Sequence, residues 1–232
     1  MSSDSTELPL YDSRNYRRAR ATLPGYRKGQ SPVNRGKKYP PEVLSRDEVL
    51  LLLDACPSDK FGLRLRALIA VLYRTGMSVS EALGARIDRL DLRPGREAIR
   101  AAGTQLVDRQ LALDAFALSY LKPWLKVRQD VPRHAVFCVL EGPTAGREWN
   151  EMQFRSQLRP ISGDALGRSV KPGWLRFTCA AELIVEQWPL SHIQSQLGMK
   201  GGWGLQQMLR KLGVESADAA EVAELARARP EP

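Results

Sequence analysis

A strongly apolar stretch in the first third of the chain sets the main constraint on the fold. Residues 63–72 carry leucine, isoleucine and alanine at helical spacing, and the stretch ends at Thr75-Gly76, a typical helix-ending pair. The longest uninterrupted apolar run, residues 67–73, is far shorter than the roughly 18 residues that suggest a membrane span. We therefore expect an apolar helix inside a soluble, cytoplasmic protein.

Capping signals mark the helices on either side of this stretch. Ser45-Arg46-Asp47-Glu48 is a capping-box pattern before a run of leucines, which predicts a first helix that Cys56-Pro57-Ser58 ends. Residues 78–83 begin another short helix after the Thr-Gly turn. The N-terminal half of the fold is therefore expected to be helical.

The rest of the chain alternates short and long segments. Residues 86–113 contain short leucine-rich and β-branched stretches broken by glycine and proline, which predicts a small antiparallel sheet. Helices are expected at 114–128 and 148–158, a buried strand at 135–140, and helices from residue 171 onward, the last at 214–229. The predicted fold class is mainly α with a small antiparallel β-sheet (α+β), organised as a 1–41 arm, a 42–213 domain and a 214–232 helix.

Cysteine and histidine usage bears on metal and redox chemistry. The three cysteines, Cys56, Cys138 and Cys179, are widely spaced among apolar neighbours, which fits reduced core thiols. His134 and His192 are the only histidines, and neither is near a cysteine in the sequence. We expect no metal site and no cofactor.

Positive charge is concentrated in the first 41 residues. The net charge of the chain is +9, and residues 1–41 hold nine basic and three acidic side chains, leaving +6 there and +3 elsewhere. A basic segment interleaved with tyrosine, glycine and proline is typical of a flexible arm that neutralises phosphates, although a solvated leader has the same composition. The candidate DNA contacts in this arm are Arg17, Arg18, Arg20, Arg27, Lys28, Lys37 and Lys38.

Four local motifs occur in a fixed order across residues 42–213. They are Arg74-Thr75-Gly76-Met77-Ser78-Val79-Ser80-Glu81-Ala82-Leu83, the segment from Ala102-Gly103-Thr104 to Leu113, Trp174-Leu175-Arg176-Phe177, and Ile193-Gln194-Ser195-Gln196-Leu197-Gly198-Met199. They resemble, in turn, the T-G-L-R-I-S-E-L stretch, the G-K-G hairpin, the H-x-L-R-H motif and the I-Q-x-L-L-G-H motif of tyrosine recombinases. The chain thus resembles the catalytic domain of this phage-integrase family.

The resemblance implies a set of catalytic positions, most of which are substituted here. The family uses a tyrosine nucleophile, two arginines that neutralise phosphate oxygens, a lysine acid and supporting histidines. These positions fall on Ser78, Thr104, Gly173, Met199 and, for the nucleophile, on or near Met208; only Arg176 matches. The last tyrosine of the chain is Tyr120, so no small shift of the alignment restores the nucleophile.

These substitutions predict a catalytically inactive, recombinase-like DNA-binding protein and not an enzyme. Its expected partners are double-stranded DNA and either an active recombinase or a second copy of the chain, in an accessory or regulatory role in recombination or integration. Family members carry a helical core-binding domain ahead of the catalytic one, and we expect either that the basic arm acts in its place or that the DNA affinity is low. The 214–232 helix is expected to pack on another protomer or on its own domain, and no membrane partner is expected.

Outside the arm, Arg100, Arg109 and Arg176 are the candidate DNA contacts. Arg176 is expected either to hold a backbone phosphate or to pair with a carboxylate such as Glu81 or Glu182. Glu81 itself is expected to cap a helix or pair within the fold.

Two other functions remain open. An active recombinase with an unusual constellation would need a nucleophile such as Ser195, Ser191 or a tyrosine supplied by another protomer. A protein-interaction module on the same scaffold would instead show low DNA affinity at moderate salt.

Overall fold

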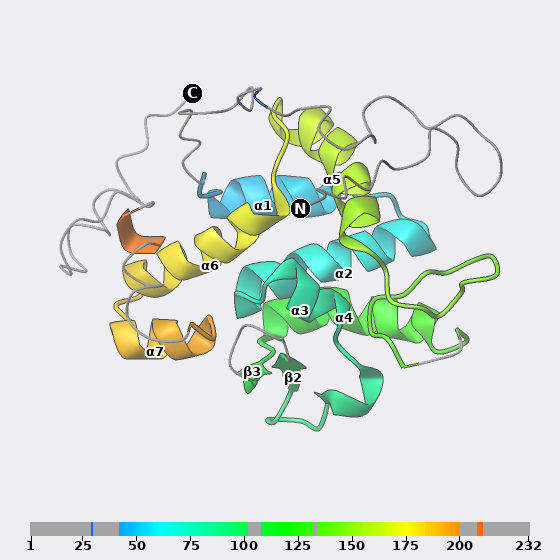
Figure 1. Ribbon diagram of the computed structural model, residues 1–232, viewed down its shortest axis with the longest axis horizontal. Helices are drawn as coiled ribbons and strands as arrows, with labels where there is room; N and C mark the ends of the chain where they lie inside the picture. Colours follow the sequence, from blue (N-terminus) through cyan, green and yellow to red (C-terminus); the bar gives the residue numbers. More distant parts are fainter. Residues whose placement is uncertain (1–28, 30–41, 102–107, 132–133, 200–207, 211–232) are drawn as a thin grey trace, which may run out of the picture. The chain divides into compact units, whose positions relative to one another are not determined.

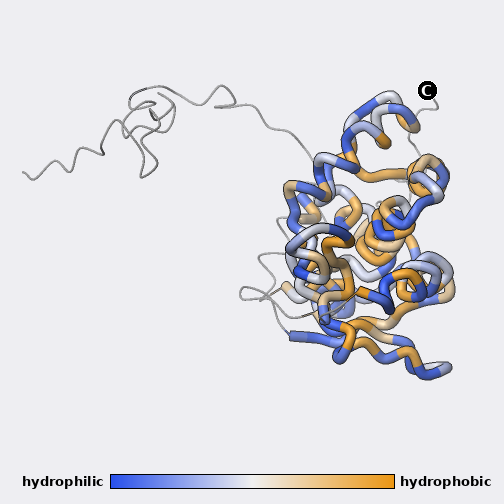
Figure 2. The backbone as a smooth tube through the Cα atoms, turned by 90° about the vertical axis from the view of Figure 1, so that its right-hand side faces the viewer, coloured by the Kyte–Doolittle hydropathy of each residue, from blue (hydrophilic) through white to orange (hydrophobic). Residues whose placement is uncertain are grey.

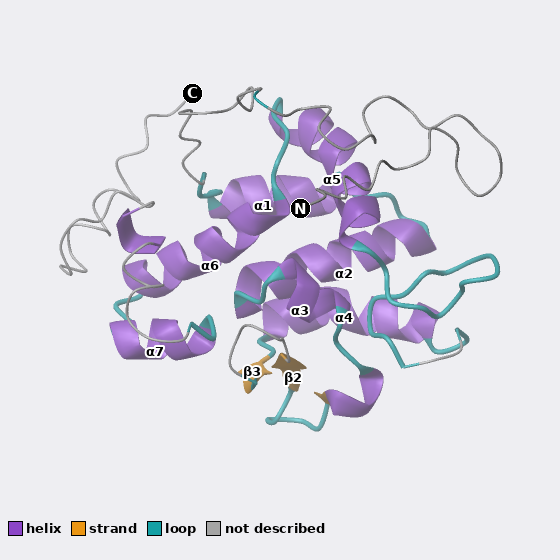
Figure 3. Ribbon diagram, in the orientation of Figure 1, coloured by secondary structure: helices purple, strands orange, loops and turns teal. Residues whose placement is uncertain are grey.

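A computed structural model describes residue 29 and residues 42–101, 108–131, 134–199 and 208–210. The chain divides into two compact units, Met1–Tyr39 and Pro40–Pro232, and nearly all described residues belong to the second. This unit is mainly helical with one three-stranded antiparallel sheet, which confirms the predicted fold class (Figure 3). Most of the 1–41 arm, Thr104, and the 214–232 helix lie outside the described residues.

The first two helices begin where the capping signals predict. Helix α1 (Arg46–Asp54) has Ser45 as its N-cap in a full capping box with Glu48. Helix α2 (Lys60–Thr75) starts after Asp59, whose carboxylate accepts a 2.8 Å hydrogen bond from Gly62 N. It ends at Gly76, whose φ of 66° closes the helix in the left-handed region that glycine adopts without strain.

Helix α2 lies at the centre of the fold (Figure 1). It packs against α3 (Val79–Leu83), α4 (Ala115–Arg128) and α6 (Pro172–Val185). Every residue of the apolar run 67–73 is buried, so this helix has no solvent face over two turns. Figure 2 shows polar and apolar residues alternating along the chain, as expected where most helices cover a core on one side only.

The sheet is small and its register follows the apolar pattern. Strands β1 (Leu90–Asp91), β2 (Ala98–Ala101) and β3 (Arg109–Ala112) pair antiparallel in that order, after a short 3₁₀ helix, η2 (Ile87–Arg89). Ile99 of β2 faces Leu111 of β3, and both side chains are buried. This confirms the sheet expected within residues 86–113.

The prediction of a strand at 135–140 is wrong, although the prediction that this segment is buried is correct. The segment forms only isolated bridges, Arg86 with Ala135 and Cys138 with Glu148. Three of its carbonyl groups accept from side chains of helices, whereas Phe137 O and Val139 O accept from the backbone of Trp149 and Gly146. Three such donors are Arg128 Nε to Ala135 O, Trp124 Nε1 to Val136 O and Arg64 Nη1 to Cys138 O, at 2.8, 3.0 and 2.8 Å.

The helix expected at 148–158 is displaced and longer. Helix α5 (Glu151–Leu166) begins after Asn150, whose side chain accepts from Gln153 N, and continues through Pro160 to Gly167. The following α6 and α7 (Leu190–Gln196) confirm the helical reading after residue 171 as far as the structure describes it. Residues 208–210 are also helical.

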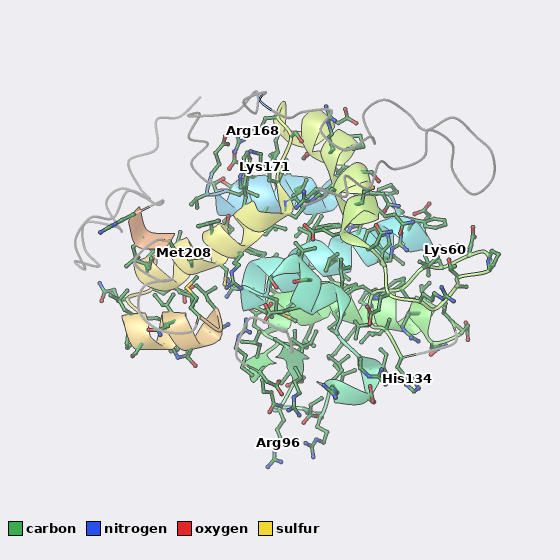
Figure 4. All side chains as sticks on the ribbon, viewed as in Figure 1. Lys60, Arg96, His134, Arg168, Lys171 and Met208 are labelled. Atoms are coloured by element: carbon green, nitrogen blue, oxygen red, sulfur yellow. The ribbon has the colours of Figure 1, made fainter. Side chains whose placement is uncertain are left out.

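The buried apolar residues form two clusters. The larger one extends from Leu44 to Leu175 and includes α2 throughout. The smaller one lies on the far side of α6 and contains Ala180, Ile184, Ile193, Leu197, Met208 and Leu209. Figure 4 shows Met208 beside the C-terminal end of α6.

The cysteines match the sequence expectation. Cys56, Cys138 and Cys179 are all buried and free. Burial raises the pKa of Cys56 to about 11 and that of Cys179 to about 12, so both remain protonated thiols at neutral pH. No helix in the described part of the chain is long and apolar enough to cross a membrane.

Candidate functional site

Several of the predicted positions come together where α2, α3, α6 and α7 meet. Ser78 precedes α3, Arg176 projects from α6, and the two are linked through Glu81. Arg176 also reaches the backbone of Leu197, two residues before Met199. The structure thus joins positions that are about 100 residues apart in the sequence, as the resemblance to recombinases implies.

Ser78 occupies a helix cap. Its hydroxyl accepts from Glu81 N at 3.3 Å and donates to Glu81 Oε2 at 2.9 Å, and its backbone N–H donates to the same carboxylate at 2.8 Å. The side chain therefore stabilises the first turn of α3 and brings no positive charge to the site.

Glu81 is a buried carboxylate that caps helix α3 and pairs with an arginine, as expected. Its side chain is 1% exposed, and Arg109 donates to it from Nη1 at 2.5 Å. Arg176 Nη1 is 3.8 Å from its other oxygen. Burial alone would raise the pKa of Glu81, but hydrogen bonds from Arg109 and Ser78 outweigh burial and hold the pKa below its usual value.

Arg109, a predicted DNA contact, has an internal position in the structure. Its side chain is 8% exposed, and besides Glu81 it donates from Nε to Gln196 O at 2.8 Å. This guanidinium joins β3 to α3 and α7. Phosphate binding by Arg109 would require it to leave these partners, so DNA contact at this residue stays a prediction.

Arg176, which the resemblance matches to a catalytic arginine, is bound to two backbone carbonyl groups. It donates to Gly76 O and to Leu197 O, each at 2.7 Å, and its side chain is 14% exposed. Burial lowers the pKa of Arg176, although Glu81 opposes the shift. The group stays charged at neutral pH, and two of its N–H donors are used within the fold.

The two residues that the resemblance matches to the family's histidines are Gly173 and Met199. Gly173 is exposed in the first turn of α6, and a Cβ added there would meet no heavy atom within 4 Å. Met199 is half-buried and packs against the smaller apolar cluster. Glycine has no side chain and the methionine thioether does not titrate, so neither residue can donate or accept a proton.

Met208, which the resemblance matches to the nucleophile, is part of the apolar core. Met208 is 5% exposed within the smaller cluster. The two described tyrosines are engaged elsewhere: the Tyr73 hydroxyl donates to Glu182, and Tyr120 packs edge-on against Phe116. No described tyrosine hydroxyl therefore belongs to this cluster.

The serines considered as substitute nucleophiles lack a base. Ser191 and Ser195 are exposed on α7, and neither hydrogen-bonds to a histidine, lysine or carboxylate among the described residues. An unactivated serine hydroxyl is a weak nucleophile at neutral pH. No group of three or more possible metal ligands occurs in the described part of the chain either.

The exposed arginines around the sheet are largely paired with nearby aspartates. Arg100 Nη2 is 2.5 Å from Asp108 Oδ2, with the Arg100 side chain 52% exposed. Arg86 and Arg93 form similar pairs with Asp88 and Asp91. Arg96 projects away from the rest of the fold at the end of the hairpin (Figure 4). This region therefore carries less unpaired positive charge than its arginine count suggests.

Internal use of arginine is the feature that sequence reasoning missed. Seven arginines are buried or half-buried and bound within the fold, and no local sequence signal separates them from exposed ones. Five of the seven donate to backbone carbonyl groups elsewhere in the chain, as Arg66 does to Leu53 O and Cys56 O. The seven are Arg64, Arg66, Arg74, Arg109, Arg128, Arg168 and Arg176.

Comparison with known proteins agrees with this arrangement. The sequence profile of the Phage integrase family matches residues 42–201. The chain is 30% identical over 171 residues to the tyrosine recombinase XerC of Azotobacter vinelandii, covering 73% of this chain and 56% of that protein. The chain thus spans little more than half the length of this relative.

Solved structures with the same fold include two recombinases. The crystal structure of XerA recombinase matches with a TM-score of 0.65 and 22% identity, covering 87% of this chain and 68% of that one. XerH site-specific recombinase, bound to its palindromic difH substrate in a post-cleavage complex, matches with a TM-score of 0.64 and 24% identity. That match covers 94% of this chain and 62% of XerH.

Proposed function

Because the chain belongs to the phage integrase family, we propose that it is a DNA-binding, recombinase-like protein that does not cut DNA. Its role would be accessory or regulatory in DNA recombination or integration. Its partners would be double-stranded DNA and an active recombinase or a second copy of itself.

The position of Arg176 carries the first half of this proposal. In the resemblance it is the one retained catalytic residue, yet its guanidinium donates to Gly76 O and Leu197 O instead of facing an open site. The nucleophile position, Met208, lies in an apolar cluster without a hydroxyl. Neither half of the cleavage reaction, nucleophilic attack or charge neutralisation, has its group in place.

The size of the expected loss supports inactivity. Removing one charge-stabilising donor from a preorganised site costs about 10²- to 10³-fold in rate. Here the first arginine, the lysine, both histidines and the nucleophile are all substituted, and such groups act as a unit. Residual cleavage would fall to the level of the uncatalysed reaction.

The charge distribution supports DNA association through the N-terminal arm. Residues 1–41 hold +6 of the net charge of +9. Within the folded part, Arg109 and Arg176 are bound internally and Arg100 is paired with Asp108. XerH, with the same fold, was crystallised on its DNA substrate. The arm would supply the phosphate contacts that the folded part lacks.

A protein-interaction module is the second candidate, and the internal arginines favour it over an active enzyme. If the family's DNA surface has lost its free positive charge, the same scaffold could present a protein-binding face. An active recombinase would need a nucleophile from another protomer, because Ser191 and Ser195 have no activating base among the described residues.

Cleavage is tested with a nicked suicide duplex that traps covalent intermediates. We expect the full chain to form no 3′-phosphoryl adduct and to relax no supercoiled plasmid. The same result is expected when the protein is in excess, so that a second copy of the chain is available. A trapped adduct would overturn the inactive assignment and would identify the nucleophile by mass spectrometry.

DNA binding is tested by titrating random duplex DNA at several salt concentrations, with and without residues 1–41. An arm that engages roughly five or six phosphates gives a log K versus log salt slope near −5, and its removal should flatten that slope. Arg100→Glu is the matched variant for the sheet, because this side chain is exposed and its reversal leaves the core intact. If neither change alters affinity, Arg109 and Arg176 are the next residues to reverse, and low affinity of the full chain for duplex DNA at moderate salt would favour the protein-interaction module.

A further inference from the structure

Two buried arginines share one carboxylate at the centre of the candidate site. Arg109 donates to Glu81 at 2.5 Å, and Arg176 lies 3.8 Å from the same group. The cluster therefore holds two positive charges against one negative charge in a region from which water is largely excluded. A further source of negative potential is needed to stabilise it.

That potential comes from the C-terminal end of α7. The last carbonyl groups of a helix have no partner within the helix, and they form the negative end of its dipole. Arg109 Nε donates to Gln196 O at 2.8 Å, and Arg176 Nη2 donates to Leu197 O at 2.7 Å. Both arginines thus cap the same helix end.

Two glycines allow the close approach that this capping requires. Gly198, with φ of 65°, ends α7, and a Cβ there would lie 2.3 Å from Arg109 Nη1. Gly76, with φ of 66°, ends α2, and a Cβ there would lie 2.6 Å from Leu197 Cδ2. Arg176 spans the gap between these two helix ends by binding Gly76 O and Leu197 O.

The attachment of α7 matters because α7 belongs to the smaller apolar cluster. Ile193 and Leu197 pack there with Met208, apart from the main core. Among the described residues, three polar contacts fix the end of α7 to the rest of the fold: Arg109 to Gln196 O, Arg176 to Leu197 O, and Gln196 Nε2 to Thr75 O at 3.3 Å. Loss of the arginines would free the end of α7 while the main core stays folded.

We infer that Arg109, Glu81 and Arg176 form a clamp that fixes the C-terminal end of α7 to the α2–α3 turn. Arg109 and Arg176 are positioning residues in this clamp, not phosphate ligands. The catalytic arginine of the family resemblance has here become a support for the fold, and the space of the phosphate site is filled by internal contacts. This inference goes beyond the proposed function and holds whether or not the protein binds DNA.

Hydrogen exchange of the backbone amides tests the clamp. In Arg109→Lys, which keeps the charge but loses the bidentate fork, we expect exchange in residues 190–199 to be about 10- to 100-fold faster. Exchange in α1 should be unchanged, because α1 does not contact the clamp. Arg100→Lys on the neighbouring strand is the matched control and should leave α7 as in the wild type. Unchanged exchange in α7 of Arg109→Lys would overturn the inference.

Inorganic phosphate provides a second test on the unmodified protein. If the arginines are a closed clamp, phosphate should change the melting temperature relative to sodium chloride at equal ionic strength by the same amount in the wild type and in Arg176→Lys, because phosphate stabilises folded proteins non-specifically. A higher melting temperature in phosphate that disappears in Arg176→Lys would show an open anion site and refute the clamp. This readout remains decisive even if the Arg109 variant fails to fold, and it is independent of the DNA-binding slope.

Discussion

Replacing Met208 with tyrosine restores the family's nucleophile at the matching position and should damage the protein without activating it. Met208 is 5% exposed among Ala180, Ile184, Ile193 and Leu197, and all described members of this cluster are apolar. Overpacking a filled core costs about 1–3 kcal/mol, and a buried hydroxyl without a partner costs about 1–3 kcal/mol more. We expect Met208→Tyr to lower the free energy of unfolding by about 2–6 kcal/mol.

Urea unfolding followed by circular dichroism measures this change, with Met208→Leu as the control. Leucine conserves volume and polarity, so the control should lose less than about 1.5 kcal/mol. The tyrosine variant should also form no adduct on a nicked duplex. A variant as stable as the wild type would mean that the position opens toward solvent, and any trapped adduct would mean that the other catalytic roles are already filled.

Three further perturbations follow from individual contacts. Glu81→Gln should cost about 3–5 kcal/mol at neutral pH because it leaves two buried arginines without their carboxylate. The pKa of Glu81 in the folded protein is below its usual value of 4.5, so the carboxylate stabilises the fold above that pH. The difference in free energy of unfolding between the wild type and the variant should therefore shrink as acid protonates Glu81. A difference that stays constant from pH 7 to pH 3 in urea titrations would contradict this. Thr178→Val should cost about 1–3 kcal/mol in thermal unfolding, since Leu44 N loses its 3.0 Å partner, whereas Ser156→Ala on exposed α5 should cost less than about 0.5 kcal/mol. Deleting residues 214–232 should lower the melting temperature or the oligomeric mass measured by light scattering, and no change in either would mean that this segment has no apolar partner.

Local signals explain which elements could be predicted from the sequence. Ser45 with Glu48, and Ser78 with Glu81, are three residues apart, and each pair forms the capping box that the pattern indicates. Gly76 likewise ends α2 where the Thr-Gly pair predicts. In each case the interacting groups lie within one helical turn, so the residues that decide the structure are adjacent in the sequence.

Long-range contacts explain the strand that was predicted wrongly and the arginines that were missed. The backbone of residues 135–138 is satisfied in part by Arg64, which is 74 residues away from Cys138. Arg109 binds Gln196 O across 87 residues. A continuous apolar run predicts burial correctly, but it does not reveal whether the backbone partner is a strand or a guanidinium. The sequence likewise does not reveal the partners of Arg109 and Arg176. Both lie in segments that match the family's motifs, but their N–H groups donate to acceptors within the fold.

The anchoring of the 135–149 region by Arg64 makes this part of the fold insensitive to acid. The guanidinium is stacked 3.8 Å from the Trp149 ring and donates to Cys138 O, and neither partner gains or loses a proton between strongly acidic and neutral conditions. Burial lowers the pKa of Arg64 to about 10, so the cation persists until the solution is clearly alkaline. Acid should therefore loosen the Glu81 region first and leave this loop attached, whereas alkali should release the loop first. Arg64 lies near one end of α2, and the turn before Glu81 lies at the other. The contacts at these two ends would thus be lost at opposite extremes of pH.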